Sequence, residues 1–178
     1  MASPDKRPKI SIHSPQSEQE RDRVYGFRYR TLVERQGGSS VHADHEKKVI
    51  KDDLDDSAFH LFLMAKGGVV ASVRVNSAAL SQFPEKLVKQ FQFDKFSEFG
   101  SGALSMTSRL FMAGGSMQSK MAAVLMGAAY KIVRNKGNRF DFASCPPSMV
   151  GLYEMLGYRR MAPTSRTRMA SIRFRCAS

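Results

Sequence analysis

Two stretches of the chain repeat hydrophobic residues with the spacing of an α-helix. Tyr25, Tyr29 and Leu32 fall at i, i+4 and i+7, which places them on one helical face. With an N-cap residue at Ser17 and two glycines after Gln36, this pattern predicts a helix from Ser17 to about Gln36. The second stretch predicts a helix that Gly137 ends, and its repeating residues are Met121, Val124, Leu125, Ala128 and Ile132.

Shorter segments rich in β-branched and aromatic residues predict strands. Phe59–Ala65 and Val69–Ser77, joined by Lys66-Gly67-Gly68, have the pattern of an antiparallel hairpin. Short helices are expected at Pro84–Phe96 and Pro147–Met155, and the polar stretch 39–57 predicts a loop with a short helix. The other predicted strands are Lys9–His13, Leu104–Met112, Phe140–Ser144, Gly157–Met161 and Met169–Arg175. This order indicates a mixed α/β fold with a central sheet.

The length and composition fit one soluble domain. A chain of 178 residues can bury one core, so we expect a flexible arm over residues 1–8 and a single domain over residues 9–178. No apolar run approaches the roughly 18 residues that span a bilayer, and the N-terminus lacks the hydrophobic segment of a secretory signal. The distant Cys145 and Cys176 suit a reducing compartment. We therefore expect a cytoplasmic protein with at most peripheral membrane contact.

The net charge changes this picture. Lys and Arg number 28 against 16 Asp and Glu, a formal charge of +12, which attracts anionic partners. A nucleic-acid-binding module would gather its basic and aromatic residues on one face, whereas the aromatic residues here follow the periodicity of a core. An acidic protein or a phosphorylated cofactor is therefore favoured over nucleic acid, and a generally basic surface is the simple alternative.

A strand, a glycine pair and a helix follow one another between Ser108 and Ser119. Gly114, Gly115 and Ser116 stand just before the predicted helix. A helix N-terminus carries about half a positive charge and free N–H groups, and glycines let the backbone approach an anion closely. The segment is a candidate site for a phosphate such as that of phosphopantetheine, although a plain turn capped by Ser116 has the same sequence.

The segment Leu152–Arg160, LYEMLGYRR, follows one strand and a Pro-Pro pair. It resembles the signature of the GNAT superfamily, and the resemblance extends over roughly residues 20–162. It implies an α/β GNAT fold, a mixed central sheet with splayed strands flanked by helices, in which the donor's pantetheine arm lies between two strands. It also implies that Tyr153 protonates the departing thiolate; packing in the core is the alternative for this side chain. The donor-binding residues indicated by the resemblance are Phe111, Met112, Gly114, Gly115, Ser116 and Gln118.

Other segments resemble a narrower group within that superfamily, the long-chain N-acyl amino acid synthases and the acyl-homoserine-lactone synthases. The similar positions are Val24–Arg30, Asp52, Asp55, Arg74, Ser108 and Arg109. Three features depart from the relatives. Met106 stands where the lactone synthases have a proposed glutamate base, the glycine loop lacks the spacing of acetyl-CoA enzymes, and the chain has no tryptophan. The chain is therefore placed nearer the N-acyl amino acid synthases.

Several residues of these motifs are candidates for contacting substrate. The substrate-binding candidates are Arg28, Tyr29, Arg74, Ser108 and Arg109. A guanidinium binds a carboxylate through paired N–H groups, although ion pairs with the acidic run at 52–56 are an alternative for each arginine. The acids that could accept the amine proton through water are Glu34, Asp52 and Asp55.

The sequence therefore predicts an N-acyltransferase. Its donor is an acyl-phosphopantetheine thioester, carried by an acidic acyl carrier protein or by CoA, and its acceptor is the amine of an amino acid or similar small molecule. The phenylalanines between Phe83 and Phe99 could wall a pocket for a medium or long acyl chain, or pack a helix on the sheet. No metal is expected, because His42, Asp44 and His45 fit no zinc spacing. The alternatives are a lactone-type signal synthase, a non-catalytic GNAT domain and a basic nucleic-acid-binding module.

Overall fold

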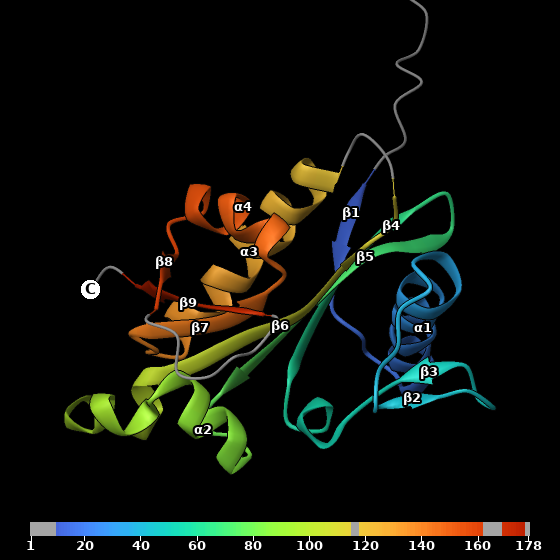
Figure 1. Cartoon of the computed structure of the whole chain (residues 1–178). Helices are drawn as coiled ribbons and strands as arrows, with labels where there is room; N and C mark the ends of the chain where they lie inside the picture. The colour runs from blue at the N-terminus through green and yellow to red at the C-terminus, as the bar shows by residue number, and fades with distance from the viewer. Residues whose placement is uncertain (1–9, 115–117, 162–168, 177–178) are drawn as a thin grey trace, which may run out of the picture.

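A seven-stranded sheet forms the centre of the molecule, in the order β1-β4-β5-β6-β7-β9-β8 (Figure 1). The computed structural model describes residues 10–114, 118–161 and 169–176, so the predicted arm at residues 1–8 lies outside it. Neighbouring strands are antiparallel except for β6 and β7, which are parallel. The strands of this sheet are β1 (Ser11–His13), β4 (Phe59–Ala65), β5 (Gly68–Ser77), β6 (Leu104–Met112), β7 (Phe140–Cys145), β8 (Arg159–Arg160) and β9 (Ala170–Arg175). The predicted mixed α/β fold is confirmed.

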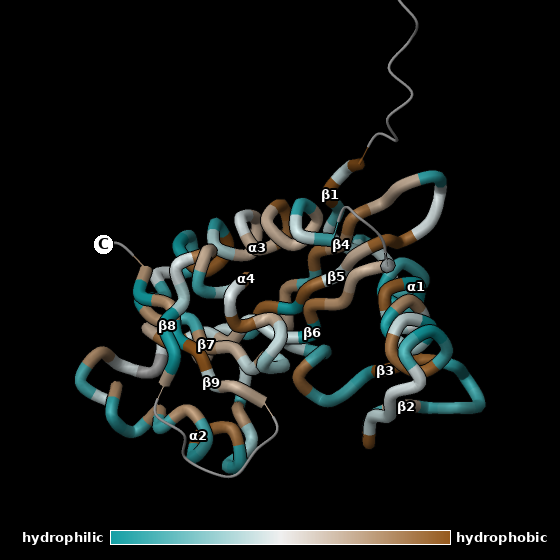
Figure 2. The backbone as a smooth tube through the Cα atoms, turned by 45° about the horizontal axis from the view of Figure 1, so that its top comes forward, coloured by the Kyte–Doolittle hydropathy of each residue, from teal (hydrophilic) through white to brown (hydrophobic). Residues whose placement is uncertain are grey.

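Helices cover both faces of the sheet. The helices are α1 (Glu18–Tyr29), α2 (Glu85–Phe91), α3 (Gln118–Asn135) and α4 (Val150–Met155). On one face α3 contacts β4, β5 and β6, and Leu125 lies in one buried cluster with Leu63 and Val73. On the other face Phe91 packs against Phe142 of β7. The hydropathy of the chain follows this arrangement, because the central strands run through hydrophobic residues and the outer loops through polar ones (Figure 2). None of the described helices is long and apolar enough to cross a membrane.

The most local predictions are those that the structure follows best. The β4–β5 hairpin turns at Lys66 and Gly67, whose φ angles of 49° and 77° suit a tight two-residue turn. The strand predicted at Leu104–Met112 has these same limits. Ser17 caps α1 as predicted, since its side chain accepts a hydrogen bond from the backbone N–H of Glu20.

Two predicted helices begin as α-helices and continue in another helical form. The first is α-helical to Tyr29 and continues to Arg35 as a π-helix, a form that is frequent at functional sites. The helix predicted over Pro84–Phe96 stops at Phe91, because Gln92 has a left-handed φ of 53°. A 3-10 helix, Phe93–Phe99, follows it. The phenylalanines of both segments lie in one buried cluster with Leu104 and Phe140, so helix packing is their main role.

The stretch 39–57 is more ordered than its polar composition suggests. The expected short helix is a 3-10 turn, Asp53–Asp55. A small two-stranded sheet, β2 (Ala43–Asp44) and β3 (Val49–Ile50), was not predicted. Its strands are too short to show periodicity, and Ile50 is the fully buried anchor that holds β3 against α1.

Candidate active site

The strands β6 and β7 separate part-way along their length. They pair only at Leu104–Met106 and Phe140–Phe142, whereas β6 runs on to Met112 and β7 to Cys145. Beyond Met106, the described part of β6 has no strand partner on its β7 side. Backbone N–H groups on such an edge need other partners, so a ligand can bind there.

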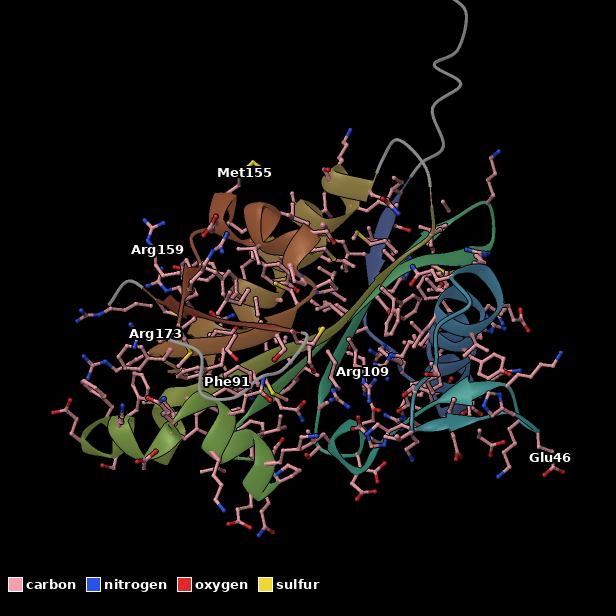
Figure 3. All side chains as sticks on the ribbon, viewed as in Figure 1. Glu46, Phe91, Arg109, Met155, Arg159 and Arg173 are labelled. Carbon is pink, nitrogen blue, oxygen red and sulfur yellow. The ribbon has the colours of Figure 1, made fainter. Side chains whose placement is uncertain are left out.

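A β-bulge lies in β6 at the start of this gap. The step from Ser72 to Arg74 in β5 faces the longer step from Phe111 to Ser108 in β6, so β6 carries one extra residue. Arg109 lies in this bulge and has a left-handed φ of 55°, a conformation that costs an arginine about 1 kcal/mol or more. Bulges redirect side chains, and here the bulge directs Arg109 toward Asp52. In Figure 3, Arg109 and Phe91 lie inside the molecule, whereas Glu46, Met155 and Arg159 lie at its periphery.

A cavity of about 650 Å³ occupies the gap between the separated strands. Three of the predicted donor-binding residues, Phe111, Met112 and Gln118, line it. Gly114 is exposed at the end of β6 and is not part of the lining. Gly115 and Ser116 lie outside the described residues. The wall opposite β6 comes from β7, the turn after it and α4, through Ser144, Cys145, Pro146, Ser148, Met149, Leu152 and Tyr153.

Tyr153 is buried in α4 and belongs to the wall of this cavity. Its ring stands perpendicular to that of Tyr158, with centroids 5.3 Å apart. Burial raises the pKa of Tyr153 well above that of a free tyrosine, and the nearby Cys145 and Asp141 add to the shift. The hydroxyl is therefore protonated at neutral pH and can donate a hydrogen bond to a group bound in the cavity.

The motif residues of three distant segments form one ion-pair network. Arg28 Nη1 lies 2.8 Å from Asp55 Oδ1, and both side chains are fully buried. Arg74 contacts Asp52 and also lies 3.1 Å from the other oxygen of Asp55. Arg109 forms an ion pair with Asp52. The alternative of ion pairs, which the sequence left open for each arginine, is realised for all three.

Hydrogen bonds within the 52–55 turn position Asp52 and Asp55 for their contacts with the arginines. Asp52 caps the 3-10 turn by accepting the backbone N–H of Leu54, and Asp55 accepts the N–H of Asp52 in return. Burial would raise the pKa of Asp52, but Arg74 and Arg109 outweigh it and lower the pKa to about 2. The pKa of Asp55 is likewise lowered, because Arg28 and Arg74 outweigh its burial. Both acids are thus ionised ion-pair partners at neutral pH and weak proton acceptors.

The other predicted residues divide between the network and the surface. Ser108 accepts a hydrogen bond of 3.1 Å from Nε of Arg74, so it belongs to the network. Tyr29 is buried away from it, and its hydroxyl is hydrogen-bonded to Nδ1 of His45. Glu34 is exposed on the π-helix, 3.8 Å from Lys48, and lines neither this cavity nor the neighbouring one described below.

Sequence reasoning missed His60, which joins the network from β4. Its Nε2 donates to the carbonyl of Asp55 over 3.0 Å, and its Nδ1 accepts from Arg28 over 3.2 Å. Burial and the neighbouring arginines lower the pKa of His60, although its bond to Asp55 opposes them, so the imidazole is neutral. The sequence did hold one signal for this residue, because His60 is a polar residue within the otherwise apolar strand predicted at Phe59–Ala65.

A second cavity, of about 750 Å³, lies on the other side of Arg109. Arg109, Ser144 and Met169 line both cavities, so the two meet at these residues. The remaining lining of the second cavity is mixed. Its polar residues are His42, Asp52, Asp53, Arg74, Lys86, Gln90 and Ser108, and its apolar residues are Leu54, Pro84, Leu87, Phe91 and Met106.

Solved structures with the same architecture identify the fold. FeeM, an N-acyl amino acid synthase from uncultured soil microbes, is 16% identical and matches with a TM-score of 0.71 over 96% of this chain and 92% of that chain. The AHL synthase LasI is 12% identical, with a TM-score of 0.66 over 96% of this chain and 91% of that chain. The GNAT domain of S. lividans PAT is 13% identical, with a TM-score of 0.62 over 93% and 90%. The chain has the GNAT fold. No family model matches it, and no curated protein matches it by sequence.

Met106, at the position where the lactone synthases have a glutamate, is buried and lines the second cavity. Among the described residues, no group of three or more His, Cys, Asp and Glu side chains could hold a metal ion. The side chains described above offer a protonated hydroxyl at Tyr153 and a cluster of paired guanidinium and carboxylate groups.

Proposed function

We propose that this protein is an N-acyltransferase that moves a medium or long acyl chain from a phosphopantetheine thioester to the amine of an amino acid or similar small acceptor. The observation that carries the proposal is the meeting of two cavities at Arg109, where β6 and β7 separate. A two-substrate reaction needs two sites that share one point, and a direct transfer needs both reactants there at once.

The donor belongs in the first cavity. Its pantetheine arm lies between β6 and β7, and its phosphate lies near Gln118 at the start of α3, where helix N–H groups favour an anion. Backbone N–H groups near Phe111 and Met112 polarise the thioester carbonyl and stabilise the oxyanion that forms. The net charge of +12 favours an acidic acyl carrier protein as the source of this thioester, with acyl-CoA as the alternative donor.

The reaction does not need a strong base in the active site. An α-amino group with a pKa near 8 is about one-tenth neutral at pH 7, so enough nucleophile is present without a strong proton acceptor. The amine nitrogen attacks the carbonyl carbon, the carbon–sulfur bond breaks, and Tyr153 donates its proton to the departing thiolate. The amine proton leaves through water, and Tyr153 regains a proton from solvent. Loss of the glutamate at position 106 is compatible with this scheme.

Release of free thiol from acyl donors tests the proposal. Purified protein is mixed with acetyl-, hexanoyl-, decanoyl- or myristoyl-thioesters, each supplied both as acyl-CoA and on a bacterial acyl carrier protein. The acceptors are a panel of amino acids and S-adenosylmethionine, and products are identified by mass spectrometry. We expect amine-dependent thiol release and N-acyl amino acids with the longer donors, fastest from the carrier protein. Absence of product with every donor and acceptor, and in lipid extracts of expressing cells, would indicate a non-catalytic GNAT domain.

A further inference from the structure

Three of the described residues line both cavities, and an inference about one of them, Ser144, rests on the proposed function. The three are Arg109, Ser144 and Met169, so they surround the point where the thioester carbonyl and the amine would meet. Met169 is apolar, and the guanidinium of Arg109 is paired with the carboxylate of Asp52. Ser144 brings to this point a hydroxyl that is not part of the ion-pair network.

Ser144 lies in β7 beyond Phe142, the last residue of that strand that pairs with β6. Alternate side chains of a strand share a face, so Ser144 lies on the face of Phe142, against which Phe91 of α2 packs (Figure 1). On its other side, Ser144 is directly opposite Ser171 of β9. Opposite residues of an antiparallel pair are neighbours on one face, so the two serines lie side by side under α2.

Gln90 of α2 joins these two serines. Its Nε2 lies 2.7 Å from Oγ of Ser144 and 3.2 Å from Oγ of Ser171, and an amide nitrogen has two hydrogens to donate. Neighbouring residues of α2, among them Leu87 and Phe91, belong to an apolar cluster. Polar groups at such an interface gain nothing over apolar packing, so their presence at the edge of two cavities points to a role in the reaction.

The direction of the hydrogen bond decides what Ser144 can do. A hydroxyl has one hydrogen to donate and also accepts. Because Oγ of Ser144 accepts from Gln90, that bond leaves its hydrogen unused, and no other hydrogen bond of this side chain is found among the described residues. Since Ser144 lines both cavities, its hydrogen is available to an acceptor at their meeting point.

The acceptor that develops at this point is the oxygen of the thioester. When the amine nitrogen attacks the carbonyl carbon, one electron pair of the C=O bond moves to oxygen, and it returns when the carbon–sulfur bond breaks. A donor aimed at that oxygen stabilises the charge. We infer that Ser144 is a catalytic residue that donates a hydrogen bond to this oxyanion from β7, opposite the backbone N–H groups of β6, and that Gln90 is the positioning residue that orients the hydroxyl.

Substitutions of Ser144 test the inference with one productive thioester and one productive amine. Ser144→Ala should lower kcat about 100-fold, the usual effect of removing one oxyanion donor, and leave the donor KM within about twofold. Ser144→Thr keeps a hydroxyl on a residue that suits a strand, so kcat should stay within about fivefold of the wild type. The matched control is Ser171→Ala: Ser171 accepts from the same amide but lines neither cavity, so kcat should change less than about threefold.

Gln90→Glu tests the positioning role with little change of shape. An ionised carboxylate accepts but cannot donate, so the hydroxyl of Ser144 should turn toward it and be lost to the oxyanion. We expect kcat to fall at least about tenfold, and we expect the double variant with Ser144→Ala to be no slower than Ser144→Ala alone. A direct effect of the new charge on the reaction would instead slow the double variant further, and that result would overturn the role of Gln90.

Unchanged kcat in Ser144→Ala would overturn the inference, and transfer by the wild-type protein would leave the proposed function standing. A loss confined to KM would also overturn it, because Ser144 would then bind the donor equally in the ground state and the transition state. An equal loss in Ser144→Ala and Ser144→Thr would assign the effect to shape rather than to the hydroxyl. Melting temperatures check that each variant is folded. Absence of transfer by the wild-type protein to every amine would instead overturn the proposed function, and the inference with it.

Discussion

The two walls of the candidate active site use polar groups in opposite ways. On the side of β5, β6 and the 52–55 turn, the polar groups are ionised and paired, as in Arg74 with Asp52. On the side of β7 and α4, they are buried in surroundings that favour the neutral form. Burial raises the pKa of Tyr153, and it likewise raises the pKa of Asp141, a β7 residue outside the lining of both cavities that is hydrogen-bonded to Ser105 and Tyr158 rather than to a cation.

This difference separates two tasks. An ionised network holds a charged ligand, but its acids cannot exchange protons near neutral pH because their pKa values are too low. A neutral, dry wall keeps a hydroxyl protonated and strengthens its interaction with a thiolate. Recognition is therefore expected from the ionised wall and proton donation from the neutral one, and each of the following changes tests that division.

The largest effect is expected from breaking the ionised wall at its most buried pair. Asp55→Asn removes the carboxylate that pairs with the fully buried Arg28, its one carboxylate partner among the described residues, which should lower the free energy of unfolding by about 3–5 kcal/mol. Urea denaturation measures the loss. The matched control is Glu34→Gln, which removes the exposed pair with Lys48 and should change stability by less than about 0.5 kcal/mol. If Glu34→Gln also lowered turnover, Glu34 would return as a candidate proton acceptor.

The neutral wall is tested by removing one oxygen atom. Tyr153→Phe should lower kcat about 100-fold, the usual contribution of a general acid, and leave the donor KM and the melting temperature nearly unchanged. Steady-state kinetics provide both numbers. Tyr158→Phe is the control from a tyrosine that contacts Tyr153 but lines neither cavity: it loses the hydrogen bond to Asp141, so it should lower stability by about 1–3 kcal/mol while kcat is retained. Unchanged turnover in Tyr153→Phe would leave Tyr153 a packing residue.

Acid should weaken the ionised wall selectively. Because the pKa of Asp52 is lowered to about 2 in the folded protein, its contribution to stability is present above about pH 4 and is lost as the pH falls toward 2. The loss from this residue should amount to about 2 kcal/mol. Unfolding free energies measured between pH 5 and pH 2 should show this decline, and Asp52→Asn should flatten it. An equal decline in both proteins would contradict the assignment.

The smallest effect is expected at Asp141, and it has the opposite sign. Its folded pKa is raised, so stability is full at low pH and decreases as the pH rises above the unfolded value of about 4. Asp141→Asn keeps the shape of the neutral acid and should remove this decrease, leaving the variant as stable as the wild type or up to about 1 kcal/mol more stable at pH 8. Thermal unfolding across pH 5–8 checks the slope, and a strongly destabilised variant would show that the carboxyl has a further structural role.

The sequence determined those features that depend on neighbouring residues. The β4–β5 hairpin, β6 and the cap at Ser17 follow from turn chemistry and periodicity within a few residues, so the pattern sufficed to predict them. The same is true of the segment that resembles the GNAT signature, which predicted the fold that the solved structures share. The break at Gln92 escaped prediction, because a left-handed residue other than glycine carries no local signal.

Only the tertiary structure decided how the charges are distributed. The sequence supplied three arginines and a run of aspartates, but their pairing depends on segments 22 to 57 positions apart and on the bulge that directs Arg109. Burial then fixed the chemistry, since the same carboxyl group is ionised at Asp52 and neutral-favouring at Asp141 according to whether guanidinium groups surround it. The sequence determines which residue types are present, whereas the environment that folding creates determines their ionisation states.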